Sequence, residues 1–303
     1  MKIKDLGEIG LIERISKGVS LDRSVIKGIG DDTAVITWDS DKYMLYTCDI
    51  LVEDTHFTTR SATPFQIGWK AMARNISDIA AMGGLPRHAV ISLALDPGKP
   101  VSFVDKIYEG IKSAANIFKV NIVGGDMARS KKTVIDISLV GEVEKKNLVT
   151  RAGARSGDLI FVTGSVGGSI KGKHLTFIPR VRQARMLVEN FAVSSMIDVT
   201  DSLILDLQRI LTASRVGARI EEALIPVSKA VRSFEKAVTD GEDFELLFTM
   251  SPRQAKRFLK TGLSRMDIPV TLIGEVTEKR YGYILAAEDG KERKIKAKGY
   301  LHF

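Results

Sequence analysis

Acidic residues stand beside glycine, or at the expected end of a strand or helix, in six places along this chain. The six segments are Gly30-Asp31-Asp32, Thr47-Cys48-Asp49, Asn75-Ile76-Ser77-Asp78, Gly124-Gly125-Asp126, Asp198-Val199-Thr200-Asp201 and Gly241-Glu242-Asp243. One such aspartate alone is typical of a solvated turn. Carboxylates that gather in one cleft, however, repel each other and cannot all stay ionised without cations. Hard oxygen ligands select Mg²⁺, which is often shared with substrate phosphates, so the pattern predicts a site for several Mg²⁺ ions and a phosphorylated substrate.

Other metal sites have little support in the sequence. The histidines His56, His88, His174 and His302 are scattered, and the single cysteine, Cys48, has no second thiol to pair with, so zinc is not expected. The Asp-x-Asp-x-Asp-Gly loop of an EF-hand is also absent.

Residues 167–174 come close to a phosphate-binding loop. Their sequence fits Gly-x-x-x-x-Gly-Lys, but His174 stands where a Ser or Thr would bind Mg²⁺, and no helix is expected directly afterwards. We therefore expect a flexible basic loop that closes over an anion or is merely solvated. The dinucleotide fingerprint Gly-x-Gly-x-x-Gly and the hydrolase motif Gly-x-Ser-x-Gly are both absent.

The elements that must position these residues alternate between strands and helices. Strands are expected over residues 44–47, 89–95, 134–140, 159–163, 244–248 and 270–273. Helices are expected over residues 64–82, from about 102 to 118, and over 182–193, 201–213 and 252–261. The first of these helices starts at a capping box made by Thr63 and Gln66, with Pro64 at its first position. This interleaving predicts a mixed α/β (α+β) fold.

Length and composition favour a globular protein of two domains. The chain has 303 residues, of which 44% are hydrophobic and 27% charged, and roughly 150 residues per domain is usual. The polar, glycine-containing stretch over residues 144–157 predicts the junction, which divides the chain into domains at 1–147 and 148–303. Near the N-terminus, Leu6, Ile9, Ile12 and Ile15 recur at helical spacing and predict a short amphipathic helix.

The charge balance leaves several partners open. The chain has 45 Lys and Arg residues against 37 Asp and Glu, a net charge of +8, which admits a nucleic acid, an anionic substrate or no specific partner. The basic residues are spread along the chain, apart from residues 279–298, and no nucleic-acid-binding motif is present, so no such partner is expected. No apolar run is long enough to cross a membrane, and the N-terminus lacks a signal-peptide core. With one cysteine, which excludes an intrachain disulfide, the expected location is the cytoplasm.

The order of the motifs resembles a known family over nearly the whole chain. The segments that carry the resemblance are Gly28–Val35, Thr47–Phe57, Lys70–Gly84, Gly124–Asp126, Arg151–Ala154, Asp158–Gly164, Gly241–Phe248 and Lys298–Phe303. They are similar to thiamine-monophosphate kinase, within the aminoimidazole-ribonucleotide-synthetase-like ATP-binding superfamily. The resemblance implies two α/β domains, with N-terminal strands of two subunits forming a shared barrel in a homodimer.

The resemblance also implies roles for individual residues. The implied metal ligands are Asp32, Thr47, Cys48, Asp49, Asp78, Asp126, Asp198 and Asp201, where Thr47 and Cys48 would offer backbone or side-chain oxygen. The implied ATP contacts are Tyr108, Gly125, Asp126, Arg151 and Thr200, and the implied acceptor contacts are His56, Glu242 and Tyr300. Asp78, Asp126 and Asp201 are expected to act in catalysis. A packing role for Tyr108, a linker role for Arg151 and a structural role for His56 are the alternatives.

Four positions depart from the family pattern. Cys48 replaces a Thr, and because a thiol is a poor Mg²⁺ ligand, any contact there should come from backbone oxygen. Ser202 replaces a Gly, which puts in doubt a positive φ at that position. Asp240 replaces the first of two glycines and adds a negative charge near the acceptor, and Ala297 stands where an aromatic residue is usual, so that Tyr300 or Phe303 would take its place.

The reaction that follows from the resemblance is ATP-dependent phosphorylation of thiamine monophosphate to thiamine diphosphate. The attacking phosphate oxygen is already anionic, so direct in-line transfer depends on alignment and on charge neutralisation by Mg²⁺. One alternative is another member of the same superfamily, such as a selenophosphate synthetase or a ring-forming ligase. A reactive cysteine before Cys48, typical of selenophosphate synthetases, is absent. The other alternative is a basic nucleic-acid-binding protein.

Overall fold

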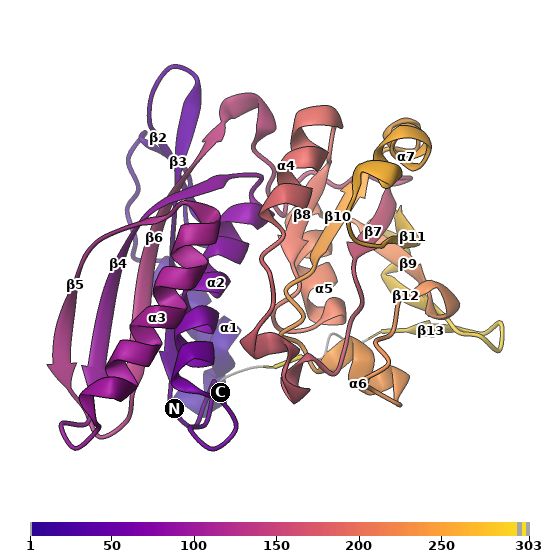
Figure 1. The fold of residues 1–303 in the computed structure, drawn as a ribbon. Helices are drawn as coiled ribbons and strands as arrows, with labels where there is room; N and C mark the ends of the chain where they lie inside the picture. The colour runs from indigo at the N-terminus through magenta and orange to yellow at the C-terminus, as the bar shows by residue number, and fades with distance from the viewer. Residues whose placement is uncertain (1, 296–298, 301–303) are drawn as a thin grey trace.

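The computed structural model describes residues 2–295, 299 and 300, which form two β-sheets with helices between and around them (Figure 1). The N-terminal sheet has the strand order β1-β2-β3-β6-β4-β5. Its strands are β1 (Val25–Lys27), β2 (Ala34–Thr37), β3 (Lys42–Val52), β4 (Leu85–Leu95), β5 (Asn121–Arg129) and β6 (Val134–Glu144). All neighbours in this sheet are antiparallel except β4 and β5, which are parallel.

The C-terminal sheet has the order β13-β12-β9-β11-β7-β10-β8. Its strands are β7 (Leu159–Thr163), β8 (Ser195–Asp198), β9 (Gly217–Glu221), β10 (Leu246–Met250), β11 (Val270–Thr277), β12 (Tyr283–Ala286) and β13 (Glu292–Lys294). The helices of the chain are α1 (Ile3–Ser16), α2 (Pro64–Ala81), α3 (Val101–Phe118), α4 (Val181–Asn190), α5 (Leu203–Ser214), α6 (Phe234–Thr239) and α7 (Pro252–Arg257). The mixed α/β class is confirmed.

The two faces of the N-terminal sheet differ. One face buries alternate residues such as Leu45, Ile91 and Ile137 beneath α2 and α3, whereas the opposite face leaves Tyr46 and Val90 exposed. The two helices approach closely, because a Cβ at Gly68 would lie 1.9 Å from the carbonyl oxygen of Ile107. Only glycine fits at such a contact.

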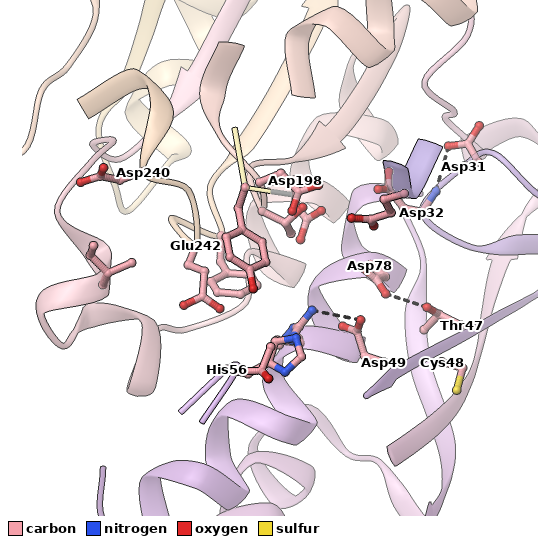
Figure 2. Close-up of a pocket in the computed structure, with 18 of the residues that line it drawn as sticks. Asp31, Asp32, Thr47, Cys48, Asp49, His56, Asp78, Asp198, Asp240 and Glu242 are labelled. Atoms are coloured by element: carbon pink, nitrogen blue, oxygen red, sulfur yellow. Dashed lines mark hydrogen bonds and ion pairs between the residues drawn. The ribbon is translucent and has the colours of Figure 1, made fainter. Parts of the chain in front are cut away.

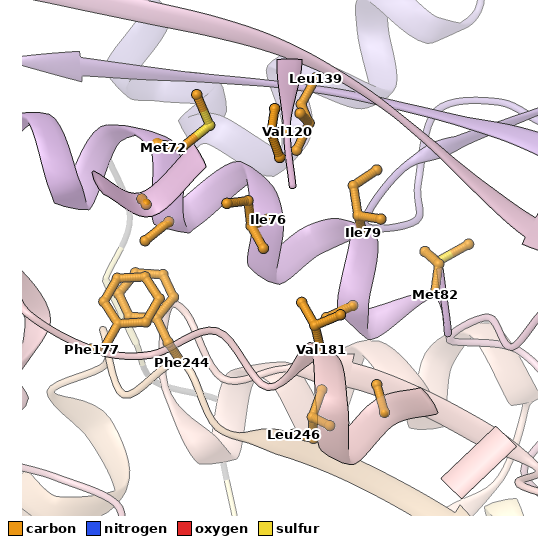
Figure 3. Close-up of a cluster of buried hydrophobic side chains, with 14 of the residues drawn as sticks. Met72, Ile76, Ile79, Met82, Val120, Leu139, Phe177, Val181, Phe244 and Leu246 are labelled. Atoms are coloured by element: carbon orange, nitrogen blue, oxygen red, sulfur yellow. The ribbon is translucent and has the colours of Figure 1, made fainter. Parts of the chain in front are cut away.

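Helix α2 lies between the two halves of the molecule and is apolar on both sides. Its side chains Met72, Ile76 and Ile79 belong to one buried cluster that extends from the N-terminal sheet to Leu246 in the C-terminal half (Figure 3). Phe177 and Phe244 stack below the helix with ring centroids 3.7 Å apart. The helix that carries Asp78 is therefore held rigidly against both halves.

The capping box predicted for α2 is present. The Thr63 hydroxyl accepts a hydrogen bond from the Gln66 amide at 3.3 Å, and the Gln66 side chain accepts one from the Thr63 amide at 2.9 Å. Strands are found at all six predicted places, but the one predicted over 244–248 begins at Leu246, because Glu242 and Phe244 adopt positive φ angles of 55° and 52°. The helix predicted from residue 201 begins at Leu203, and the one predicted to reach residue 261 changes to a π-helix at Phe258.

The N-terminal helix differs from the expected amphipathic one. Helix α1 forms, but Gly7 interrupts it with φ 67°, and none of its described residues is buried. Ile9, Ile12 and Ile15 remain exposed. The periodic spacing therefore predicted that a helix forms, but it did not predict that Ile9, Ile12 and Ile15 stay exposed. Within the described part of the chain, no helix is long and apolar enough to cross a membrane.

Candidate active site

A cavity of about 560 Å³ lies between the two halves, and acidic residues from both halves line it (Figure 2). Asp31 and Asp32 come from the loop before β2, Asp49 from β3 and Asp78 from α2. The C-terminal half contributes Asp198, Thr200, Asp201, Asp240 and Glu242. Five of the six acidic segments of the sequence thus contribute a carboxylate to a single site, and the segment that ends at Asp126 does not.

Three of the carboxylates form a compact group. Asp32, Asp78 and Asp198 each offer an oxygen, and these oxygens all lie within 4.8 Å of one another. Burial, together with the charges of Asp49 and Asp198, holds the pKa of Asp78 well above its usual value. Burial and the charge of Asp32 do the same to the pKa of Asp198. Asp32 Oδ2 is buried and has no hydrogen-bond partner among the described residues. Hard oxygen ligands, mutual repulsion and an unpaired buried oxygen together fit a divalent cation such as Mg²⁺.

Basic and hydroxyl groups hold these carboxylates in place. Thr47 Oγ1 donates a hydrogen bond to Asp78 Oδ2 at 2.6 Å, and Arg74 Nη2 lies 3.2 Å from Asp49 Oδ1. Arg74 Nε and Nη1 are buried donors without a partner in the described structure. Arg74 was not predicted at this site from the sequence, although Lys70, Arg74 and Asp78 are spaced four residues apart and so share one face of a helix.

The C-terminal half fixes its acidic residues through Asp206. One oxygen of this buried carboxylate accepts hydrogen bonds from the amides of Thr200, Asp201 and Ser202, at 2.9, 3.1 and 3.2 Å. Arg209 bridges Asp206 and Asp201. Burial raises the pKa of Asp206 to about 6. The Asp206 carboxylate thus determines the path of the turn that carries Asp201.

Two of the departures from the family pattern now have a structural account. Ser202 has an extended backbone, with φ 173°, and its hydroxyl accepts a hydrogen bond from the Leu205 amide as the cap of α5. The position needs no positive φ, so a serine fits. The Cys48 thiol lies 3.3 Å from Asp136 Oδ2 and points away from Asp78 in Figure 2. Burial raises the pKa of this thiol, and contact with a metal from its side chain is not favoured.

Glu242 also lines the cavity, as do His56 and Tyr300. Its two oxygens contact Lys70 Nζ at 2.6 Å and His174 Nδ1 at 2.7 Å. Burial opposes ionisation of this carboxyl, but the hydrogen bond to His174 and the charge of Lys70 outweigh it and lower the pKa to about 2. Neither Lys70 nor His174 was predicted at this site from the sequence.

Three predicted site residues do not line this cavity. Tyr108 is half-buried on α3 and packs against the core, in agreement with the packing alternative. Gly125 and Asp126 lie on the edge strand β5, and Asp126 lines a separate shallow groove with Ser92 and Asp136. Within one chain the structure does not bring Asp126 to Asp32 and Asp78. The roles of Tyr108, Gly125 and Asp126 stay predictions, and the site described by the other residues does not depend on them.

The glycine- and lysine-rich loop over residues 167–174 does not form a phosphate-binding loop. It folds into two short 3₁₀ turns at Ser169–Lys171 and Lys173–Leu175, and no α-helix follows directly. Lys173 Nζ lies 2.9 Å from Glu245 Oε1, and His174 contacts Glu242. The anions on which this loop closes are carboxylates of the chain itself.

Comparison with known proteins places the chain in a family. The model of the AIR synthase related protein N-terminal domain matches residues 30–143, and the model of the corresponding C-terminal domain matches residues 155–286. The thiamine-monophosphate kinase of Rhodopirellula baltica is 38% identical over 295 residues, which cover 92% of each chain. The chain belongs to the thiamine-monophosphate kinase family. The enzyme of that name from Aquifex aeolicus is 36% identical, with both chains covered completely.

Solved structures agree with the membership of this family. The structure of AaThiL complexed with AMPPCP and TMP has a TM-score of 0.86 and 33% identity, and covers 100% of this chain and 99% of that one. Hydrogenase maturation protein HypE, with a TM-score of 0.71 and 20% identity, shares the fold. The two-domain fold expected from the sequence is therefore confirmed. The predicted boundary at residues 147 and 148 falls between the two matched domain models and stays a prediction.

Proposed function

We propose that this chain transfers the γ-phosphoryl group of ATP to the phosphate of thiamine monophosphate, which yields thiamine diphosphate and ADP. The observation that carries this proposal is the group of Asp32, Asp78 and Asp198, which faces a cavity between the two halves in a chain of the thiamine-monophosphate kinase family. A site of such charge is suited to metal-bound phosphates and unsuited to an apolar ligand.

We assign Mg²⁺ binding to the acidic residues of the cavity. The assigned ligands are Asp32, Asp49, Asp78, Asp198 and Asp201, with oxygens of Thr47 and Cys48. When bound, Mg²⁺ supplies the positive charge that lets two phosphorylated substrates approach each other. The carboxylates need such a partner, because burial alone disfavours their ionised forms.

The basic residues of the cavity act on the phosphates. Arg74 has two buried donors with no partner in the described structure, and it lines the cavity beside Asp49. Guanidinium groups bind phosphate oxygens well, because their donors match the spacing of those oxygens. The acceptor is a phosphate oxygen that is already anionic at neutral pH, so no general base is assigned. The residues of the site instead align donor and acceptor for in-line attack.

We further propose that the chain works as a homodimer built on the open face of the N-terminal sheet. Tyr46, Ile50, Val90 and Val123 are between 41% and 61% exposed on this face, an unusual amount of apolar surface. The same sheet carries Gly125 and Asp126. A homodimer built on this face places both residues close to the subunit boundary, and we keep their assignment to ATP and Mg²⁺ for that assembly. The free Cys48 and the absence of a second cysteine fit a cytoplasmic protein.

A coupled assay of ADP formation tests the proposed reaction. Thiamine monophosphate, thiamine and selenide are offered in parallel with ATP and Mg²⁺. We expect turnover with thiamine monophosphate alone. Turnover with selenide, or no turnover with either thiamine compound, would instead favour another activity of the same superfamily. Steeply salt-dependent binding of generic DNA without ATP turnover would favour the nucleic-acid-binding alternative.

A further inference from the structure

A lysine is completely buried beside the cavity. The side chain of Lys70 on α2 has no exposed surface, and its ammonium group lies within 3.0 Å of three polar groups. These are the carbonyl oxygen of His56 at 3.0 Å, Glu242 Oε1 at 2.6 Å and His174 Nδ1 at 2.8 Å. Burial lowers the pKa of Lys70 and the charge of Glu242 opposes that change. Burying an ammonium group costs free energy that apolar packing would avoid.

Glu242 is constrained from several directions at once. Lys70 contacts one carboxylate oxygen and His174 contacts the other at 2.7 Å. The backbone of Glu242 has a φ of 55°, which is unfavourable for a side chain of this size, and its amide donates to the carbonyl of Thr200 at 2.6 Å. Strain of this kind persists only where the surroundings hold it. The orientation of the Glu242 carboxylate is therefore determined by its neighbours.

These contacts join three segments that are distant in the sequence. Lys70 belongs to the N-terminal half, Glu242 follows α6 in the C-terminal half, and His174 belongs to the 3₁₀ turn Lys173–Leu175. Glu242 lines the cavity, whereas Lys70 and His174 are not among the described residues that line it. Each carboxylate oxygen has more than one acceptor site, so contact with Lys70 and His174 leaves capacity for a ligand.

We propose that Lys70 and His174 are positioning residues, which hold the Glu242 carboxylate in one orientation and so determine the affinity for the acceptor substrate. Lys70 compensates the charge of Glu242, so that Glu242 acts on the organic part of the acceptor as a fixed hydrogen-bond acceptor. This inference rests on the proposed function, because the contact between Glu242 and the acceptor is itself a proposal.

The test compares steady-state kinetics of Lys70→Met, His174→Gln, Glu242→Gln and the double variant Lys70→Met with Glu242→Gln. A hydrogen bond to a charged group is worth about 1.5–3 kcal/mol, so we expect the KM for thiamine monophosphate to rise roughly tenfold or more in Lys70→Met and His174→Gln. The KM for ATP should change less than about twofold, because the Asp cluster is untouched. The double variant should be no worse than Glu242→Gln alone, since Lys70 acts only through Glu242.

Lys99→Met is the matched control. The Lys99 ammonium lies 3.5 Å from Glu53 Oε1, and neither residue is among those that line the cavity. If the KM for thiamine monophosphate and the KM for ATP rose by the same factor, Lys70 would serve stability alone. The same would follow if the effects of Lys70→Met and Glu242→Gln added up in the double variant. If Glu242→Gln leaves the KM for the acceptor unchanged, the proposed acceptor contact itself fails. If only Glu242→Gln raises it, the contact stands and the positioning role fails. Should Lys70→Met not fold, His174→Gln decides, because His174 lies on a partly exposed loop.

Discussion

Arg151 Nη2 lies 2.6 Å from Asp32 Oδ1, so a residue just after the predicted domain junction neutralises a carboxylate of the N-terminal half. The backbone amide of Arg151 also donates to Asp31 Oδ1 at 3.2 Å. Burial raises the pKa of Asp31, as does the neighbouring charge of Asp32. The guanidinium group of Arg151 opposes this rise in the pKa of Asp31. Arg151 lines the cavity, and its contact with ATP stays a prediction.

Replacing Arg151 by Met should weaken the binding of ATP. A charge-assisted hydrogen bond would be lost and Asp32 would be left without its cation, so we expect the Kd for a non-hydrolysable ATP analogue with Mg²⁺ to rise roughly tenfold or more. Calorimetric titration measures this value. Arg182→Met, which removes an exposed arginine paired with Asp267 at 3.0 Å, is the control. An unchanged Kd in the Arg151 variant would remove this residue from the nucleotide site.

Replacing Asp78 by Asn should nearly abolish turnover and leave the protein folded. The carboxylate is lost from the centre of the acidic group, whereas the amide keeps the size of the side chain and the hydrogen bond from Thr47. The free energy of unfolding should stay the same or rise, since a buried repulsive charge is removed. Measurements of kcat and of urea unfolding test both parts. Near-normal activity would exclude Asp78 from the metal site, and Asp289→Asn, an exposed substitution, is the control.

Mg²⁺ should stabilise the protein against heat. A cation that binds the folded carboxylates and not the unfolded chain raises the Tm, and the effect grows with its concentration. Since the pKa values of Asp78 and Asp198 are raised, protons compete with Mg²⁺, and the gain in Tm should increase as the pH rises. Thermal unfolding with Mg²⁺ or a chelator measures this gain. A gain of the same size in Asp78→Asn would place the ion elsewhere.

The stability of the protein should fall with rising pH because of Asp243. Burial raises the pKa of this carboxyl from its ordinary value of 3.8 to about 7, although Gly167 donates its amide to both oxygens. Between these two values the folded state holds a proton that the unfolded state has lost, so the free energy of unfolding decreases as the pH rises through this window. At about 1.4 kcal/mol per pKa unit, the effect is on the order of a few kcal/mol.

Asp243→Asn isolates this contribution, because the amide oxygen still accepts from Gly167 and cannot ionise. The advantage of the variant in urea unfolding should grow as the pH rises from 5 through 7, and should level off only above the pKa of Asp243 in the folded state. A difference that does not depend on pH would show that Asp243 titrates normally.

Val90→Glu should dissociate the proposed homodimer. Val90 is 41% exposed on β4, on the open face of the sheet, and a buried unpaired carboxylate at a subunit interface is unfavourable. Light scattering coupled to size-exclusion chromatography gives the mass of each form. A wild-type monomer, or a variant that remains dimeric, would overturn the proposed interface. Val101→Glu, at a residue that is 76% exposed at the start of α3, is the control.

The sequence by itself determined the local features of this protein. The capping box at Thr63 and Gln66 depends on residues three positions apart, and the strand at Leu159–Thr163 depends on a short apolar run. The acidic segments could be recognised as candidate metal ligands, because residue type and neighbouring glycines carry that information. The departures at Cys48 and Ser202 were also visible, although their consequences were not.

Tertiary structure decided which of these segments meet. Ser77 donates a hydrogen bond to Asp198 from a segment 121 residues away, and Lys70 reaches Glu242 across 172 residues. The spacing of residues in the sequence does not predict such contacts, because they result from the packing of α2 against both halves. In the same fold Gly125 and Asp126 lie on the edge strand β5, and they do not line the cavity that the other acidic segments share. Residue types indicate which chemistry is possible, but the place of the site depends on contacts between distant segments that only the folded chain establishes.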